Sequence, residues 1–139
     1  STDIFTTSWG ELNVDLGLKL KIKEKAEILT GVNYFNFQQK IDKNKDKFTD
    51  MTLQDRISVF QKWNFNRKEN RIFNLAGRFM YEDRNGGDIR WEKKFRGGDS
   101  IYGESIYTSR YEILGNYQIP TKEKIMLAFS YNSHAQDSR

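Results

Sequence analysis

The feature that most constrains the fold is an uninterrupted alternation of apolar and polar residues from Glu11 to Lys23. Leucine, isoleucine or valine occupies every second position, and charged residues, asparagine or glycine occupy the positions between them. Side chains of a β-strand point alternately to its two faces, so this pattern predicts a strand with one apolar and one polar face. The run exceeds the ~5–6 residues of a soluble strand and matches the ~9–11 residues with which a tilted strand crosses a bilayer.

Five further segments show strand-like patterns. They are residues 26–38, 53–65, 73–82, 105–119 and the segment from residue 124 onward. Segment 26–38 carries apolar residues on both sides, so its outward face stays open at this point. Pro120 ends segment 105–119, because proline has no amide hydrogen to donate to a strand ladder. The sequence therefore predicts an all-β chain of about six strands.

The connections between these strands are predicted to alternate in length. Short ones lie near residues 24–25, 66–70 and 120–123, and long ones span about 39–52 and 83–104. Outer-membrane barrels have short periplasmic turns and long extracellular loops, whereas soluble sandwiches have no physical reason to segregate loop lengths. We therefore expect an antiparallel up-and-down transmembrane barrel whose short turns face the periplasm.

Aromatic residues lie near the predicted strand ends, as the girdles of a membrane barrel require. The alternative interpretation of the same residues is ordinary core packing. Those expected toward the long loops are Trp9, Tyr81, Tyr107 and Tyr131, and those expected toward the short turns are Trp63, Phe65 and Tyr117.

The charged strand faces are expected to point into a lumen. A lysine or arginine that faced lipid at the bilayer midplane would cost ~2–4 kcal/mol, so Lys19 and Arg78 are predicted to face inward. Six strands cannot enclose such a lumen, because the smallest membrane barrels have about eight. Residues 1–139 are therefore predicted to be part of a single β-barrel domain of the bacterial outer membrane, with no plug domain among them.

Composition removes several other classes of protein. With 37% hydrophobic and 14% aromatic residues the chain is not a disordered tail, and it has no cysteine for a disulfide or thiolate metal site. It also lacks the ~20 consecutive apolar residues of a transmembrane helix. The net charge is +4, but the basic residues alternate with 19 acidic ones and form no long block, which argues against nucleic-acid binding.

Three strings near the second long connection carry a family resemblance. They are YEDRNGG at residues 81–87, FRGGD at residues 95–99 and YGESIYTSRYE at residues 102–112. They resemble TonB-dependent outer-membrane receptors of the Bacteroidetes type, particularly those thought to import cobalamin, and the similarity extends over about residues 12–137. The resemblance implies a barrel of about 22 strands that is filled by an N-terminal plug.

The same resemblance implies energy-driven import of a scarce metal chelate, such as cobalamin or a siderophore. The expected partners are outer-membrane lipid and lipopolysaccharide, the metal chelate, the inner-membrane TonB complex and a surface lipoprotein. Residues 1–139 contain neither a plug nor a TonB box, so no energy-coupling residue can be assigned to them. The chain is expected to supply barrel wall and loops.

The first long connection is a candidate calcium site. Oxygen donors at alternate positions in a short segment are what a hard cation needs in order to gather several ligands. The pattern departs from an EF-hand, because Lys47 replaces the turn glycine and no bidentate glutamate follows. A solvated loop is the alternative, and calcium use by cobalamin receptors that the chain resembles favours the metal. The candidate ligands are Asp42, Asn44, Asp46 and Asp50.

The second long connection is the candidate for substrate or partner contact. It combines glycines, which allow tight turns, with aromatic and cationic side chains able to hold a large polar ligand. An exposed loop that keeps the protein soluble or meets lipopolysaccharide phosphates is an equal alternative. The candidate contact residues are Arg84, Trp91, Arg96 and Tyr102.

No enzymatic activity is predicted. His134 is the single histidine and has no nucleophile or metal-ligand partner at a standard spacing. The carboxylates Glu82, Asp83 and Glu112 could pair for acid and base chemistry only at separations that strand assignments do not fix. Two rival classes remain, a soluble all-β ligand-binding domain and an outer-membrane barrel enzyme with its active site on the extracellular rim.

Overall fold

The computed structural model describes residues 1–139 and contains seven strands, so the expectation of about six was wrong by one. The additional strand is short, and five residues are too few for alternation to identify a strand from sequence. The seven strands are β1 (Thr2–Thr6), β2 (Leu12–Ile22), β3 (Ala26–Phe37), β4 (Leu53–Phe65), β5 (Phe73–Gly87), β6 (Gly103–Gln118) and β7 (Met126–Ser138).

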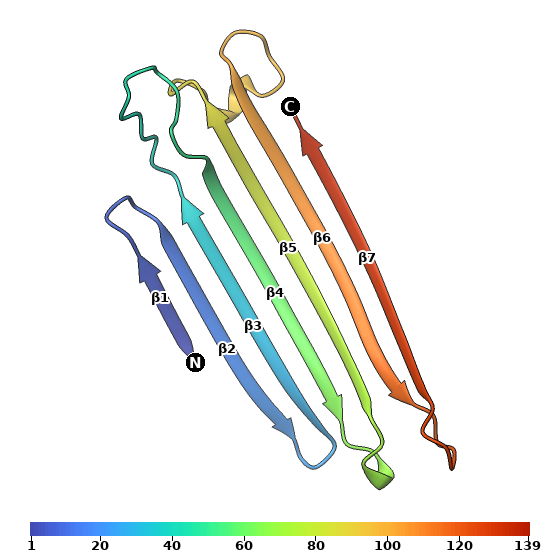
Figure 1. Ribbon diagram of the computed structural model, residues 1–139. Helices are drawn as coiled ribbons and strands as arrows, with labels where there is room; N and C mark the ends of the chain where they lie inside the picture. Colours follow the sequence, from blue (N-terminus) through green and yellow to red (C-terminus); the bar gives the residue numbers. More distant parts are fainter.

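All seven strands form one antiparallel sheet in which each strand pairs with its neighbours in sequence (Figure 1). This confirms the all-β, up-and-down part of the prediction. The sheet is open, because β1 and β7 are its two edges and do not pair with each other. β1 pairs with residues 12–16 of β2, so residues 18–22 of β2 have no strand beside them on that side.

The register gathers the apolar residues of β2 to β7 on one face of the sheet. Residues opposite each other in antiparallel strands share a face, so each row across the sheet has a single orientation. We call this side the apolar face. Its larger residues include Leu16, Leu18, Leu20, Ile28, Val32, Val59, Trp63, Leu75, Phe79, Ile113 and Phe129.

The same register assigns the two faces of β3, which the sequence left open. Ile28 and Val32 lie opposite Leu20 and Leu16 of β2, and therefore belong to the apolar face. Leu29, Phe35 and Phe37 consequently lie on the other side. The choice depends on which β2 residues β3 meets, and the β3 sequence alone does not contain that information.

The opposite side of the sheet, which we call the polar face, carries most of the charged strand residues. Both Lys19 and Arg78 lie on it. Its charges pair across strands, as in the 3.0 Å contact between Lys19 Nζ and Glu27 Oε2. The other charged or amide residues on this face include Asp15, Asn33, Arg56, Lys62, Glu82, Arg110 and Glu112.

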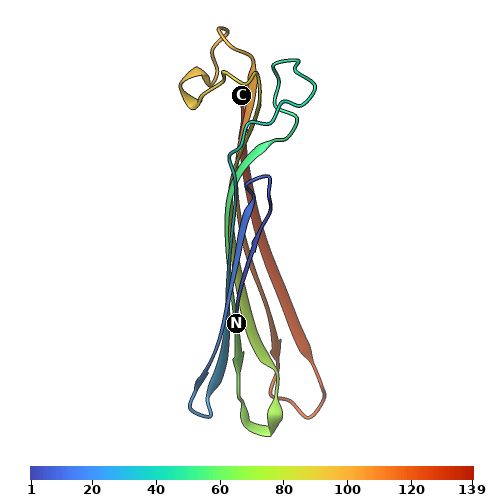
Figure 2. The same ribbon diagram turned by 90° about the vertical axis from the view of Figure 1, so that its left-hand side faces the viewer.

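The sheet is a single layer with little core. Seen edge-on, it is a thin twisted sheet with no second layer against either face (Figure 2). Only 12 of 139 residues are buried, whereas Leu18 is 54% exposed and Leu127 is 55% exposed. No helix in the structure is long and apolar enough to cross a membrane. The apolar face is therefore uncovered by any part of this chain.

The two predicted long connections lie at one end of the sheet and the three predicted short ones at the other, as expected (Figure 1). The short connection 7–11, which was not predicted, lies at the same end as the long ones. The short turns are residues 23–25, 66–72 and 119–125, and the opposite end carries residues 7–11, 38–52 and 88–102. We call these the short-turn end and the long-loop end. The second long loop is shorter than expected, because β5 continues to Gly87 and β6 starts at Gly103.

Aromatic side chains form a row beside the short turns on the apolar face. Phe65 stacks on Phe73 with ring centroids 4.5 Å apart, and Phe73 meets Tyr117 edge-on at 5.6 Å. Trp63 lies 6.0 Å from Phe65. The positions predicted for Trp63, Phe65 and Tyr117 are thus confirmed. The position predicted for Tyr131 was wrong, because it pairs with Ile113 in the middle of β7.

Candidate functional site

The two long loops are packed against each other at the long-loop end. Backbone hydrogen bonds run from Thr49 N to Gly87 O at 2.8 Å and from Ile89 N to Lys47 O at 2.9 Å. The Lys40 ammonium group donates to the carbonyl oxygens of Ile89 and Trp91, each at 2.7 Å. The loops therefore form one ordered cluster.

Loop 88–102 is held against the sheet surface that continues the apolar face. Lys93 Nζ donates to Asp83 Oδ2 at 2.5 Å, and this hydrogen bond raises the pKa of Lys93 above its ordinary value of 10.5. Arg96 donates from Nε to Ser105 Oγ at 3.1 Å, and its guanidinium lies 4.2 Å from the centre of the Tyr107 ring. These contacts form because this side of the sheet carries polar residues beyond Tyr81, among them Asp83 and Ser105.

A second ion pair shapes the start of the same loop. Asp88 accepts two hydrogen bonds from the Arg90 side chain, at 3.0 and 2.6 Å, and a third from the Arg90 backbone at 2.8 Å. These bonds lower the pKa of Asp88 to about 2. A carboxylate with a lowered pKa contributes stability that is complete above its ordinary value of 3.8 and is lost as the pH falls through about 2.

The four predicted contact residues do not come together in one place. Trp91 is buried, at 4% exposure, and the Arg96 guanidinium already contacts Ser105 Oγ and the Tyr107 ring. Arg84 lies on the polar face, with Nε 2.8 Å from Glu82 Oε1. Tyr102 is 67% exposed and could meet a ligand directly. The structure thus places Trp91 and Arg96 where they hold the loop, and their contact with a substrate stays a prediction.

The candidate calcium ligands lie in one tight loop and accept hydrogen bonds from its backbone. Asp42 accepts from Asp46 N at 3.2 Å and from Lys47 N at 3.0 Å, and Asp50 accepts from Lys43 N at 2.7 Å. Asn44 donates to Asp46 Oδ2 at 2.9 Å. No group of three or more His, Cys, Asp and Glu side chains has a geometry that could hold a metal ion. The calcium site therefore stays a prediction.

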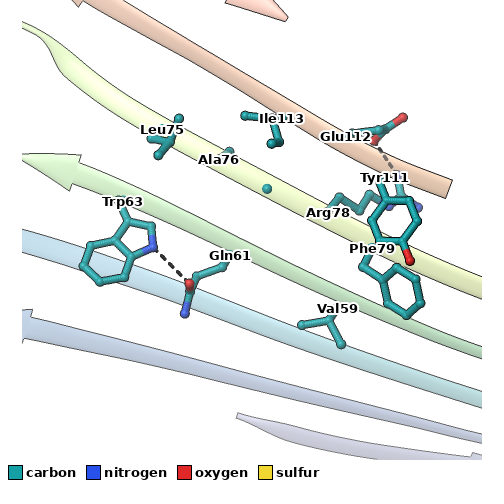
Figure 3. A pocket seen from close by; sticks show the side chains of 11 residues that line it. Val59, Gln61, Trp63, Leu75, Ala76, Arg78, Phe79, Tyr111, Glu112 and Ile113 are labelled. Atoms are coloured by element: carbon teal, nitrogen blue, oxygen red, sulfur yellow. Dashed lines mark hydrogen bonds and ion pairs between the residues drawn. The ribbon is translucent and has the colours of Figure 1, made fainter. Parts of the chain in front are cut away.

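A hollow of about 400 Å³ lies in the apolar face above Gly77 (Figure 3). Apolar walls come from β4, β5 and β6, and the missing side chain at Gly77 leaves the space open. Trp63 Nε1 donates to Gln61 Oε1 at 3.0 Å, and Gln61 Nε2 donates to Thr30 Oγ1 at 3.2 Å. Only one sign of these two linked hydrogen bonds was present in the sequence, a single glutamine, Gln61, on the apolar side of segment 53–65.

A second hollow, of about 380 Å³, lies on the polar face behind the same strands. Phe60 and Leu114 supply its apolar wall, and Arg78 and Glu112 supply its charges. Glu112 is held on both sides, because Arg78 Nη1 lies 3.9 Å from Oε2 and Asn132 Nδ2 donates to Oε1 at 3.3 Å. The sequence pattern placed these residues on one side of the strands but could not show that they enclose a space.

The groups considered for catalysis are dispersed. His134 lies exposed on the polar face, opposite Arg110. Glu82 and Glu112 also lie on the polar face, whereas Asp83 lies on the other side of the sheet and pairs with Lys93. The register therefore separates Asp83 from the other two carboxylates. The prediction that the chain is not an enzyme stays a prediction.

Comparison with protein-family models, with curated proteins and with solved structures finds no match to this chain. Function must therefore be inferred from the sheet itself.

Proposed function

We propose that this chain forms part of the wall of a transmembrane β-barrel in the bacterial outer membrane. The observation that carries the proposal is the continuous apolar face of a single-layer sheet, opposite a face crossed by ion pairs. Lipid would cover the apolar face, and an aqueous lumen would solvate the polar one. A soluble protein would need another layer to cover so much apolar surface.

The dimensions of the apolar face suit a bilayer. In β4 the mainly apolar positions run from Ile57 to Phe65, and in β5 from Phe73 to Tyr81, which is the ~9 residues that a tilted strand needs to cross the hydrocarbon layer. Beyond Tyr81 the same side carries Asp83 and Asn85. The aromatic row at Phe65 and Phe73 borders the other end, as an interfacial girdle would.

The open edges support a larger sheet. An edge strand presents unpaired amide and carbonyl groups, which cannot be satisfied inside a membrane, so spanning sheets close on themselves. β7 and residues 18–22 of β2 are such edges. Further strands would therefore continue the sheet on both sides and close the barrel.

Within this class we propose a TonB-dependent transporter that imports a scarce metal chelate such as cobalamin or a siderophore. The supporting features are the receptor-like strings between Tyr81 and Glu112, the ordered loop cluster and the polar face. The exposed Tyr102 ring and the Arg84 side chain would contact the cargo or a surface lipoprotein. Coupling to the TonB complex would require a plug domain in addition to this sheet.

Tryptophan fluorescence tests the membrane assignment. The test uses the complete barrel that contains residues 1–139, in phosphatidylcholine vesicles, with Trp63 and Trp91 as its only tryptophans. Brominated acyl chains should quench Trp63, because its ring lies on the apolar face beside the aromatic row. Trp63→Phe should remove this quenching, whereas Trp91→Phe should preserve it, since Trp91 is buried beside Gly103 at the long-loop end. Equal quenching in both variants, or none in the wild type, would contradict the assignment and favour a soluble sheet.

Calcium is proposed to order the loop that contains Asp42 and Asp46. Added calcium should slow tryptic cleavage at Lys43 and Lys45, because the metal would fix a backbone now held by side-chain hydrogen bonds. The double variant Asp42→Asn with Asp46→Asn should abolish this protection, whereas Asp99→Asn in the other long loop should retain it. An unchanged cleavage rate of the wild type over the calcium titration would contradict the proposed calcium site.

A further inference from the structure

The short-turn end of the sheet carries an excess of positive charge. Its three turns contain seven basic side chains and three acidic ones. Five lysines there are exposed and have no ion pair or side-chain hydrogen bond, and they are Lys23, Lys25, Lys68, Lys122 and Lys124. At the opposite end, by contrast, Arg84, Arg90, Lys93, Lys94 and Arg96 each have an acidic partner. The four lysines of residues 38–52 have no ion pair either, but that loop also contains Asp42, Asp46 and Asp50, so the net positive charge is concentrated at the short-turn end.

The three turns are tied together into one rim. Asn66 donates from its backbone to Lys25 O and from its side chain to Glu24 O, each at 2.8 Å, which joins the first turn to the second. Arg67 reaches the end of β6, where Nη1 donates to Gln118 O at 2.7 Å and the guanidinium lies 4.2 Å from the Tyr117 ring centre. The lysines therefore project from a connected rim and not from independent turns.

The rim lies directly beside the aromatic row on the apolar face. The second turn connects β4, which ends at Phe65, to β5, which begins at Phe73, and Tyr117 lies shortly before the third turn. Aromatic rings favour the boundary between hydrocarbon and headgroups. If the apolar face meets lipid, the five lysines consequently stand at the level of the lipid phosphates.

We propose that this cationic rim binds the phosphate groups of anionic phospholipids in the leaflet at the short-turn end. The inference rests on the proposed membrane location and adds a lipid preference to it. Basic groups next to a membrane surface attract anionic lipids over about a Debye length, and this attraction weakens as salt is added. Each turn contributes at least one such group, and these include Lys25 in the first turn, Lys68 in the second and Lys124 in the third.

Partition of the complete barrel that contains residues 1–139 into vesicles tests the proposal, because the open sheet alone would leave its edge strands unpaired. Vesicles of phosphatidylcholine alone are compared with vesicles that also contain phosphatidylglycerol, at low and high salt. Replacing Lys25, Lys68 and Lys124 with glutamine should reduce the phosphatidylglycerol preference roughly tenfold or more at low salt. The matched control replaces Lys43, Lys45 and Lys94 at the long-loop end, which lowers the net charge equally and should retain most of the preference.

The outcomes separate the two proposals. Insertion into neutral vesicles without any phosphatidylglycerol preference would overturn the lipid inference and preserve the membrane assignment, and it would turn attention to an acidic protein as partner of the rim. Equal losses in the two triple variants would also overturn it, because they would reflect net charge alone. Failure to insert even into neutral vesicles, read from protease protection, would instead contradict the proposed function.

Discussion

Replacing Ile113 with lysine is expected to destabilise the bilayer-inserted barrel by ~2–4 kcal/mol, the cost of a lysine facing lipid near the midplane. Ile113 lies in β6 on the apolar face, where it is 48% exposed. Its row, which contains Gly77 and Gln61, lies midway between the aromatic row at Phe73 and the end of the apolar stretch at Tyr81. The new ammonium group would therefore be placed where water is scarcest.

The adjacent residue provides a matched control. Leu114 belongs to the same strand, is 45% exposed, and points to the polar face beside Arg78 and Glu112. Leu114→Lys should cost less than ~1 kcal/mol, because a lumen-facing lysine stays hydrated. Urea unfolding from phosphatidylcholine vesicles measures both variants. Equal costs at positions 113 and 114 would show that the two faces meet similar solvents, which a membrane barrel does not allow.

Replacing Gly87 with alanine is expected to release the loop cluster. Gly87 has a φ of 135°, and a Cβ atom there would lie 2.6 Å from Gly103 Cα and 2.8 Å from Tyr102 O. Both contacts are with backbone, so the strand pair itself would have to move. Strain of this kind costs of order 1–3 kcal/mol. Because Gly87 would shift, the backbone hydrogen bond from Thr49 N to Gly87 O would also weaken.

Tryptic cleavage after Lys93 and Lys94 reports this release. In the Gly87→Ala variant we expect cleavage to become roughly tenfold faster or more, since local opening is governed by the lost free energy. Gly86→Ala is the control, because its new Cβ would lie 3.4 Å from Thr49 Oγ1 and meet no backbone atom. If both variants are cleaved at the same rate as the wild type, Gly87 does not hold the loops together.

The sequence was most informative where one pattern extended over a whole strand. The alternation in residues 11–23 predicted β2 almost to the residue, because apolar and polar side chains there never exchange faces. β3 could not be resolved in the same way, since its apolar residues lie on both faces. Its orientation depends on hydrogen bonding to β2, which sets Ile28 opposite Leu20.

The candidate contact residues illustrate a second limit. Trp91 and Arg96 looked suited to ligand binding because large aromatic and cationic side chains in a loop often are. In the folded chain, Trp91 is buried and Arg96 reaches Ser105 and Tyr107, which belong to β6. Composition can identify side chains able to bind a ligand, but it does not reveal which of them the loop uses to hold its own shape.

What the sequence by itself determined is the strand pattern, the segregation of loop lengths and the side to which most strand residues point. These properties are local, because period-two alternation and turn residues act within a few positions of the chain. Tertiary structure alone decided the pairing of β1, the face of β3, the two hollows around Gly77 and the link between the short turns. Each of these depends on contacts between residues far apart in sequence, such as Arg67 with Tyr117, and register between strands brings such residues together.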